Sequence, residues 1–320
     1  NSNTEELYKQ TGKILVGIEP YLGAIEDQDT LILVSPDRPL VLKDGAGFIH
    51  KSSEINIKWL KMPIDPPHKI HRQVIGPFAS FESAYKYSLK LNEENIPNLI
   101  AYPKDWEIWI PIDSSLSEEY QAVVFSKIIH KKVYPSILLA SGNYFLKGEI
   151  TIEAPDGLLF KDGIYSGPFL LRPDSYGSWT LIEQVDIEKY LFGVIPHEIG
   201  ANSPEAALAS QAVLARTWAI ANLHRFQMDG YNLCSSTQCQ VYSSPLKNYP
   251  AVTKAINSTK GKILTWKGEP ISAVYHATNG GVMASIDESW DTLPVLYIRP
   301  KLDGSFRWER KFFLPLDTDE

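Results

Sequence analysis

One stretch of sequence, residues 204–226, constrains the fold more than any other. It begins at Asn202-Ser203-Pro204-Glu205, a strong helix start, because a proline at the first helical position gives up no hydrogen bond. The residues that follow are rich in alanine and mostly apolar, so we expect a helix that is buried on several sides. Such a helix needs neighbours that enclose it.

Short apolar runs separated by turn signals predict that these neighbours are mainly β-strands. Residues 13–18 and 30–34 are such runs, and Asp44-Gly45-Ala46-Gly47 marks a turn after them. Strand patterns return between residues 144 and 172 and again between residues 262 and 275. We therefore predict an α+β fold, in which a mixed, β-rich scaffold surrounds the buried Ala-rich helix and this helix bears the active site.

A strand–helix pattern occurs twice within residues 72–133. A strand over residues 74–80 leads into a helical stretch over 81–91, and a strand over 108–114 leads into a helical stretch over 116–128. Two strand–helix–strand units in succession predict a small βαββαβ module.

Serine and proline mark further boundaries in and before this module. Ser80 and Ser114 precede the two expected helices and can cap them, whereas residues 62–67 are too rich in proline for a regular element and are interpreted as a linker. We expect three parts: a β-rich segment over residues 1–71, the small module over 72–133, and a domain with the buried helix over 134–320.

Charge and hydropathy exclude some classes of protein. The chain has 31 Lys and Arg against 38 Asp and Glu, a net charge of −7, which argues against nucleic acid as a partner and does not favour an anionic membrane surface. It has no run of about 18 apolar residues, so we expect no transmembrane segment. The sequence opens at Asn1 without a methionine or an apolar leader, so we expect a mature or trimmed product from which an export signal or anchor has been removed.

The two cysteines, Cys234 and Cys239, lie five positions apart. Two close cysteines suit one disulfide in an exported protein, a pair of free thiols, or half of a metal site. No second cysteine pair exists, so a zinc site would need histidines, of which His224 is the nearest.

Among the residues capable of catalysis, Glu198 is the leading candidate. The segment His197-Glu198-Ile199-Gly200-Ala201 begins like a zinc-protease motif, but Ala201 occupies the place of the second ligand. Glu198 lies between two helical stretches in a partly apolar setting, which suits a general acid. The alternative is an ordinary loop carboxylate near the start of the next helix. Arg216 shares a helix face with Ala209 and Ala212, where it can meet a ligand or pair with a carboxylate.

Five motifs in order, over roughly residues 185–285, resemble the SpoIID/LytB family of bacterial cell-wall proteins. The first two are YLFGVIPHE at residues 190–198 and QAVLARTWA at residues 211–219. The others are CQVY at 239–242, the stretch 255–261, and YHATNGG at 275–281. Separately, Gly76-Pro77-Phe78-Ala79-Ser80-Phe81-Glu82-Ser83-Ala84 resembles the start of the peptidoglycan-binding SPOR domain, although the second half of that module has Ile110 where the first has Gly76.

The resemblance implies a peptidoglycan lytic transglycosylase. Such an enzyme cleaves the linkage between N-acetylmuramic acid (MurNAc) and N-acetylglucosamine (GlcNAc), here expected in peptide-stripped glycan, and leaves 1,6-anhydro-MurNAc ends. The family's catalytic glutamate falls on Glu198 and its helix arginine on Arg216. One carboxylate suffices, since it can protonate the leaving oxygen and then accept the proton of the sugar's own 6-hydroxyl. The implied substrate-binding residues are Gln211, Arg216, Gln240, Tyr242, Tyr275, Thr278, Asn279, Gly280 and Gly281.

Two departures from the family pattern matter. Ala209 stands where the family often has lysine, and Gln238 stands where zinc-binding members have histidine. We therefore expect a disulfide between Cys234 and Cys239, no metal and no cofactor. The family also implies export to the periplasm or cell wall, and peptidoglycan glycan strands as the partner. The alternative function is a non-catalytic, glycan-binding enhancer of a cell-wall amidase, which would then be a second partner.

Overall fold

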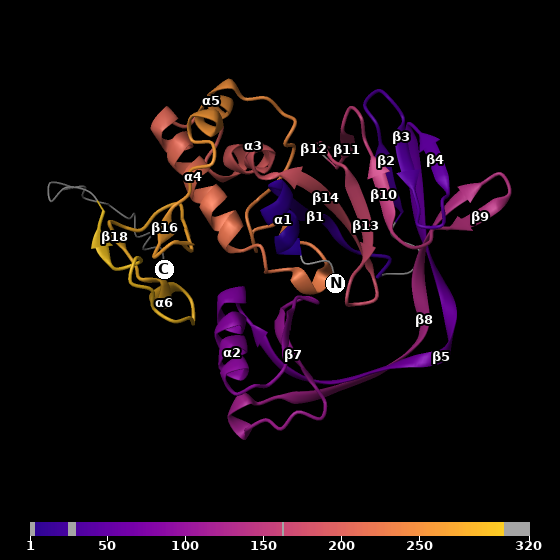
Figure 1. The fold of residues 1–320 in the computed structure, drawn as a ribbon, viewed down its shortest axis with the longest axis horizontal. Coiled ribbons are helices and arrows are strands. Elements are labelled where there is room, and N and C mark those ends of the chain that lie inside the picture. The colour runs from indigo at the N-terminus through magenta and orange to yellow at the C-terminus, as the bar shows by residue number, and fades with distance from the viewer. Residues whose placement is uncertain (1–3, 25–29, 162, 304–320) are drawn as a thin grey trace, which may run out of the picture. The chain divides into compact units, whose positions relative to one another are not determined.

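The computed structural model describes residues 4–24, 30–161 and 163–303 (Figure 1). The chain divides into two compact units, Asn1–Val274 and Tyr275–Glu320. Both helices and sheets are present in quantity, so the predicted α+β class is confirmed. None of the helices in the described ranges is long and apolar enough to cross a membrane.

The first unit contains a seven-stranded sheet in which β1, the first strand of the chain, lies next to the edge strand β15. Its order is β15-β1-β14-β13-β10-β3-β4, and every neighbouring pair is antiparallel except β1 with β15. Side chains alternate between a buried and a more exposed face in the short strands, as the apolar runs predicted. The strands are β1 (Lys13–Leu22), β3 (Leu40–Lys43), β4 (Ile49–Ser52), β10 (Ile150–Glu153), β13 (Phe169–Pro173), β14 (Trp179–Asp186) and β15 (Leu233–Cys234).

A second sheet of eight strands is built around one very long strand, β5 (Glu54–Phe78). Strand β5 pairs with β2 near its start, with β7 near its end, and with β8 over most of its length. The other strands are β2 (Leu31–Val34), β6 (Leu99–Ala101), β7 (Trp106–Pro111), β8 (Val123–Leu139), β9 (Gly142–Phe145), β11 (Leu158–Phe160) and β12 (Gly163–Tyr165).

The helices α3 (Ile187–Glu198), α4 (Glu205–Ala221) and α5 (Pro250–Ser258) pack together beside the first sheet (Figure 1). Helix α4 is the expected Ala-rich helix, and its Leu208, Ala212, Ala215 and Ala219 are fully buried. It begins one residue later than predicted, with Pro204 at the N-cap, and ends near Asn222 rather than Phe226 because the chain then turns repeatedly. Helix α1 (Thr4–Thr11) lies beside β1.

The inserted segment between β5 and β8 differs from the predicted βαββαβ module. Helix α2 (Phe81–Glu93) forms as expected, and the Ser80 hydroxyl accepts a hydrogen bond from the Ser83 N–H. The predicted helix over residues 116–128 is wrong: this stretch holds a short 3₁₀ turn (Glu118–Tyr120) and the start of β8. The β-branched Val123, Val124, Ile128 and Ile129 favour a strand, and β5 supplies the partner that the local pattern could not reveal.

The predicted linker at residues 62–67 is also wrong, since this stretch lies inside β5. Pro66 and Pro67 fall between Pro63 and His68, where the ladder with β8 is irregular, so their missing N–H groups interrupt no regular pairing. The predicted domain boundaries at 71/72 and 133/134 fall inside β5 and β8. Residues 304–320 of the predicted third domain lie outside the described residues.

The end of the first unit holds a two-stranded hairpin, β16 (Thr265–Trp266) with β17 (Glu269–Pro270). In the second unit, β18 (Val282–Met283) pairs with β19 (Lys301–Leu302). Between them, α6 (Ile286–Ser289) begins with a capping box formed by Ser285 and Glu288.

Helix α3 and the segment after the cysteines pack closely at Gly193. A Cβ placed at Gly193 would lie 2.5 Å from Cε2 of the Tyr242 ring, far inside van der Waals contact. The ring is fully buried and stacks on Tyr190 of the same helix, with 4.9 Å between ring centroids. Glycine at this helical position therefore serves the packing of Tyr242.

We predict that Gly193→Ala destabilises the protein. In an open helix this change would add up to ~1 kcal/mol of stability, but forcing a methyl group into a packed core costs typically ~1–3 kcal/mol. Since the ring cannot retreat, the clash outweighs the propensity gain. Urea denaturation should show a lower midpoint, whereas Lys189→Ala, at an exposed site of the same helix, should change stability by less than ~0.5 kcal/mol. An unchanged or raised midpoint for Gly193→Ala would contradict this packing.

Candidate functional site

Glu198 is the last residue of α3, and one of its two carboxylate oxygens is fixed by a hydrogen bond. The carboxylate is half-buried, and its Oε1 accepts a hydrogen bond from the Val241 N–H at 2.8 Å. The other oxygen, Oε2, has no hydrogen-bond partner among the described residues. Helix α3 ends here because Gly200 takes a left-handed conformation with φ of 81°. The site thus presents an oriented carboxylate at a helix end.

The Val241 N–H is itself positioned by its neighbour Tyr242. The Tyr242 hydroxyl donates to Glu183 Oε2 at 2.7 Å. Burial, with the Glu183 carboxylate next to it, holds the pKa of Tyr242 well above its ordinary value. Tyr242 was predicted to contact substrate, but its side chain is buried in the core, so it positions Val241 and does not line an open surface.

Glu183 was missed in the sequence analysis. It is 0% exposed, yet four donors reach it: Tyr242 on Oε2, and the Ser166 N–H, the Ser166 hydroxyl and the Gly167 N–H on Oε1, at 2.8–2.9 Å. A buried carboxylate is costly unless its lone pairs are filled. One signal was present, namely an acidic residue in the middle of the apolar strand pattern at residues 179–186.

Arg216, which was predicted to contact substrate, has its side chain in the core. The side chain is 1% exposed. Its guanidinium donates two hydrogen bonds to the Glu188 carboxylate of α3, at 2.9 Å to Oε1 and 2.6 Å to Oε2. It also donates to the Ala212 and Lys262 carbonyls. The Gly261 N–H donates to the same carboxylate. Arg216 thus fastens α4 to α3 and to the turn after α5.

Gln211 and Gln240, also predicted to bind substrate, are buried too. Gln240 accepts a hydrogen bond from the Tyr190 hydroxyl and donates to the Ala215 carbonyl, so it ties the Tyr242 segment to both helices. Gln211 of α4 differs, because its Nε2 is buried without a hydrogen-bond partner. Among the predicted binding residues, within the part of the chain that the structure describes, Gln211 alone has a buried side-chain nitrogen with no hydrogen-bond partner.

The remaining predicted binding residues, Tyr275 and the Thr278–Gly281 turn, belong to the second unit. The turn is held locally: Asn279 Oδ1 accepts from the Gly281 N–H at 2.9 Å and Asn279 Nδ2 donates to Asp303. Gly280 and Gly281 both have positive φ, which only glycine adopts readily. Their roles toward glycan stay predictions.

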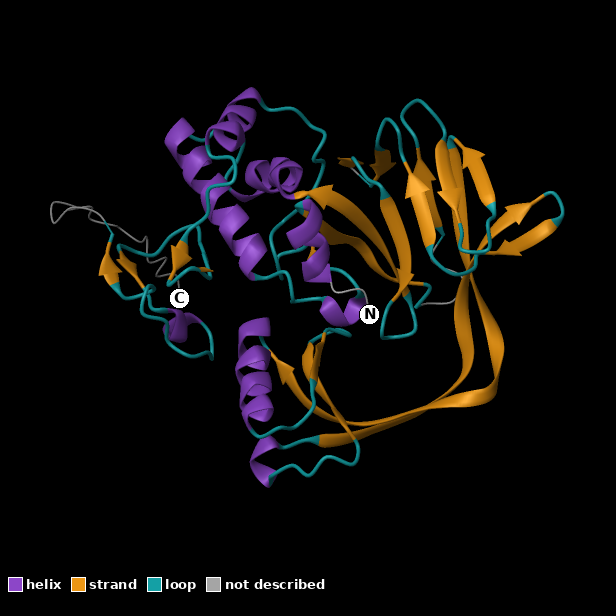
Figure 2. Cartoon of the chain, viewed as in Figure 1, coloured by secondary structure: helices purple, strands orange, loops and turns teal. Residues whose placement is uncertain are grey.

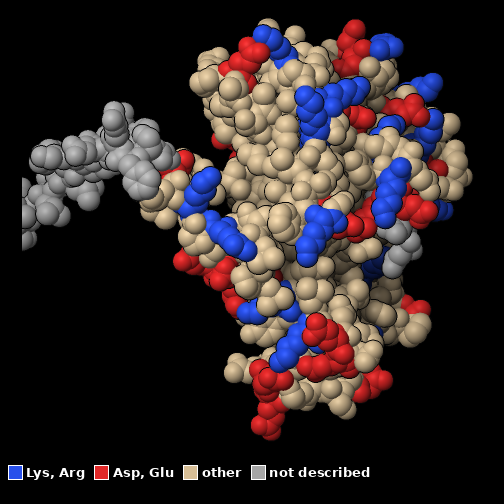
Figure 3. All heavy atoms as spheres, turned by 60° about the vertical axis from the view of Figure 1, so that its left-hand side comes forward, with Lys and Arg blue, Asp and Glu red and all other residues tan. Residues whose placement is uncertain are grey.

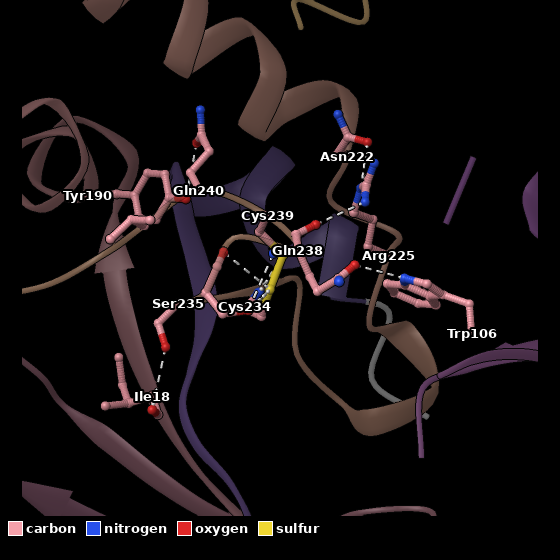
Figure 4. The surroundings of a disulfide bond; sticks show 12 residues. Ile18, Trp106, Tyr190, Asn222, Arg225, Cys234, Ser235, Gln238, Cys239 and Gln240 are labelled. Carbon is pink, nitrogen blue, oxygen red and sulfur yellow. Dashed lines mark hydrogen bonds between the residues drawn. A yellow bond between two sulfur atoms is a disulfide. The ribbon is translucent and has the colours of Figure 1, made fainter. Parts of the chain in front are cut away.

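Cys234 and Cys239 form a disulfide, the pairing that the sequence analysis favoured over zinc (Figure 4). Gln238 stands where zinc-binding members of the family have histidine. Its side-chain oxygen accepts a hydrogen bond from the Trp106 indole N–H at 3.0 Å. Its carbonyl accepts from Arg225. In the described part of the chain no group of three or more His, Cys, Asp or Glu is placed to hold a metal ion. The disulfide therefore closes the loop that leads into Gln240 and Val241.

A cleft of about 890 Å³ lies away from Glu198, between the inserted segment and the first sheet's β13–β14 turn. Phe81 and Tyr85 of α2 form one wall, and Arg172, His224 and Asp229 contribute to the other. Asp229 is 5% exposed; its Oδ2 accepts from the Tyr176 hydroxyl at 2.8 Å, and its Oδ1 has no hydrogen-bond partner among the residues that the structure describes. Burial raises the pKa of Asp229 to about 7. Sequence patterns did not single out this residue.

Part of this chain is similar in sequence to known proteins. Residues 175–266 match the family model of SpoIID, the stage II sporulation protein. An amidase enhancer of Bacillus subtilis is 36% identical over 113 residues (35% of this chain, 15% of that protein). Stage II sporulation protein D of the same organism is 29% identical over 133 residues (37% of this chain, 38% of that protein). An uncharacterised protein of Brachyspira hyodysenteriae is 32% identical over 139 residues (42% of this chain, 37% of that protein).

The matched region includes Glu198, Arg216 and both cysteines. The SpoIID/LytB resemblance predicted from the motifs is confirmed for this region of the chain. The chain spans less than two fifths of the length of each of these relatives. The SPOR-like interpretation of residues 72–133 stays a prediction.

We predict that Arg216→Ala acts first on stability. It leaves the Glu188 carboxylate without its cation, and removing one partner of a buried pair costs roughly 3–5 kcal/mol. Denaturant unfolding should show this loss, while Lys254→Ala, which breaks the exposed pair with Glu205, should cost less than ~1 kcal/mol. If Arg216→Ala kept full stability and lost only glycan affinity, Arg216 would be a substrate contact after all.

Asp229 should make stability depend on pH. The folded protein keeps this proton up to about pH 7, whereas an unfolded aspartic acid releases it near pH 4, so wild-type stability falls as pH rises between these values. Asp229→Asn removes this dependence. Relative to wild type it should gain on the order of a few kcal/mol between pH 4 and pH 8. Denaturation at both pH values measures this, with Asp37→Asn at an exposed site as control; a constant difference would refute the assignment.

Proposed function

We propose that this protein is an exported peptidoglycan lytic transglycosylase, with Glu198 as its single acid and base. The observation that supports this best is the Glu198 carboxylate itself. It lies on the SpoIID motif, it is oriented through the Val241 N–H, and it keeps Oε2 without a hydrogen-bond partner among the described residues. An oriented oxygen is what proton transfer to a glycosidic oxygen requires.

The other carboxylates on neighbouring elements support a mechanism with one carboxylate. Hydrolytic glycosidases need two, one as acid and one as base or nucleophile. Glu183 of β14 is fully buried and saturated by donors, and Glu188 of α3 is held by Arg216. Neither is available as a second catalytic group. A lytic transglycosylase does not need a second carboxylate.

The proposed reaction is an intramolecular transfer on the MurNAc residue. Glu198 donates its proton to the glycosidic oxygen, and the bond between that oxygen and the anomeric carbon breaks. The 6-hydroxyl of the same MurNAc attacks the anomeric carbon, and its proton passes to Glu198. The products are a GlcNAc-initiated chain with a free hydroxyl and a 1,6-anhydro-MurNAc end, and Glu198 is protonated again for the next cycle. No water is consumed.

Glycan retention is proposed for the cleft beside α2, within the SPOR-like segment. Tyr85 is 39% exposed and its ring lies 5.2 Å from that of His224, so an aromatic surface faces the cleft next to polar groups. Sugar rings stack on such surfaces through their C–H faces, and planar polar side chains bind their hydroxyls. Residues from both the insertion and the core then hold a peptide-stripped strand.

A second candidate is a non-catalytic, glycan-binding enhancer of a cell-wall amidase. Two observations favour it: one relative is named an amidase enhancer, and the motif residues Arg216, Gln240 and Tyr242 are structural in this chain. Under this alternative Glu198 would only bind glycan.

The test is the release of anhydro-MurNAc ends from peptide-free glycan strands, measured by mass spectrometry. Glu198→Gln keeps the shape and still accepts from Val241 but cannot deliver a proton. We expect turnover to fall by ~10²–10⁴-fold while glycan affinity stays within a few-fold, because the sugar at the cleaved bond is neutral there.

The matched control is Glu205→Gln, an exposed carboxylate in the first turn of α4 that pairs with Lys254; it should leave turnover unchanged. Near-normal turnover by Glu198→Gln would show that the catalytic assignment is wrong. A wild-type protein that binds glycan without turnover would support the enhancer.

A further inference from the structure

The long ribbon formed by β5 and β8 has a charge opposite to that of the whole chain. Residues 58–73 of β5 and 123–132 of β8 contain seven lysines and arginines and three histidines against one carboxylate, Asp65. The chain as a whole has a net charge of −7. On the face shown in Figure 3, by comparison, acidic and basic side chains are interspersed. The cations of the ribbon are Lys58, Lys61, Lys69, Arg72, Lys127, Lys131 and Lys132.

Most of these cations are exposed and not neutralised. Lys58, Lys69, Lys127, Lys131 and Lys132 are exposed, and within the described ranges none of the five forms an ion pair. Exposed lysines elsewhere in the chain form ion pairs with carboxylates, namely Lys43–Glu153, Lys90–Glu119 and Lys254–Glu205. The positive field of the ribbon is therefore available to a partner.

The ribbon also exposes apolar side chains that the rest of the described chain leaves uncovered. Val124 is 62% exposed and Ile128 is 57% exposed, and Met62, Val123 and Phe125 are exposed as well. Between Pro63 and Lys69, β5 pairs only with β8, and Figure 2 shows the two strands running together as a curved ribbon. Exposed apolar and basic groups in alternation are typical of an interaction surface.

The register of the ribbon decides what kind of partner fits. Directly opposite residues share a face, and neighbours along a strand face opposite ways. Lys69 lies opposite Ile128 on one face, whereas Lys127 lies opposite Ile70, and Arg72 opposite Phe125, on the other. Lys131 and Lys132 likewise face opposite ways. A flat membrane can reach only one face, but a linear polymer can wrap around both.

We propose that the β5–β8 ribbon binds a linear anionic polymer of the cell envelope through its phosphodiester or carboxylate groups. Lys58, Lys69, Lys127, Lys131 and Lys132 make the ionic contacts, and the exposed valines and Ile128 cover the polymer backbone. This binding goes beyond the proposed glycan chemistry, since it uses no atom of Glu198 or of the cleft at Tyr85. It would hold the protein on the wall while another part of the chain acts.

The experiment uses the full chain and fluorescently labelled inorganic polyphosphate as the probe. The ribbon variant combines Lys69→Gln, Lys127→Gln, Lys131→Gln and Lys132→Gln. The control combines Lys51→Gln, Lys104→Gln, Lys147→Gln and Lys189→Gln, which are exposed, lie outside the ribbon and change the net charge equally. Circular dichroism checks that both variants are folded.

We expect the wild type to bind polyphosphate with a strong salt dependence, because each neutralised phosphate releases counterions. The ribbon variant should bind at least ~10-fold more weakly and show a shallower salt dependence, whereas the control should stay within ~2-fold of the wild type. Absence of wild-type binding overturns the proposal. An equal loss in both variants overturns it too, since net charge alone would then explain the effect.

A third arm uses vesicles of phosphatidylglycerol. If the wild type bound these and not polyphosphate, and the ribbon variant bound neither, the ribbon would be a membrane surface and the proposal would be wrong. Release of anhydro-MurNAc ends is measured in the same preparations. Failure of that reaction contradicts the assignment of Glu198, while the polyphosphate result reports on the ribbon alone.

Discussion

A carboxylate that no solvent reaches, that of Glu183, holds together the segments around Glu198. It accepts hydrogen bonds from the Ser166–Gly167 turn and from Tyr242, and so connects two segments that are far apart in the sequence. Because a buried charge without partners is very costly, all four donors must be in place together. Tyr242 then fixes the main chain of its neighbour Val241, whose N–H orients Glu198. The site depends on a residue that cannot itself meet substrate.

The ion pair between Arg216 and Glu188 performs a similar task for the helices. It joins α4 to α3, and the Gly261 N–H brings the turn after α5 to the same carboxylate. The disulfide and Gln240 tie the Tyr242 segment to the rest. Several residues of the family motifs therefore position the end of α3 and do not form its surface.

Average composition conceals how charge is distributed in this chain. A net charge of −7 argued against nucleic acid and did not favour an anionic membrane surface, yet the β5–β8 ribbon concentrates seven cations beside a single carboxylate. The two segments are separated by the α2 insertion in the sequence and become neighbours only through strand pairing. Electrostatic arguments for such a protein must be made surface by surface.

Local pattern alone determined the α+β class, the buried α4, the cap at Ser80, the SpoIID/LytB motifs and the candidate Glu198, because these depend on residues close together in sequence. Pairing over long distances decided the rest. Residues 116–128 became a turn and a strand rather than a helix because β5 offered a partner, and the proline-rich stretch at 62–67 joined that strand for the same reason. Whether Arg216 or Tyr242 faces substrate or core depended on Glu188 and Glu183, whose positions only the tertiary structure sets.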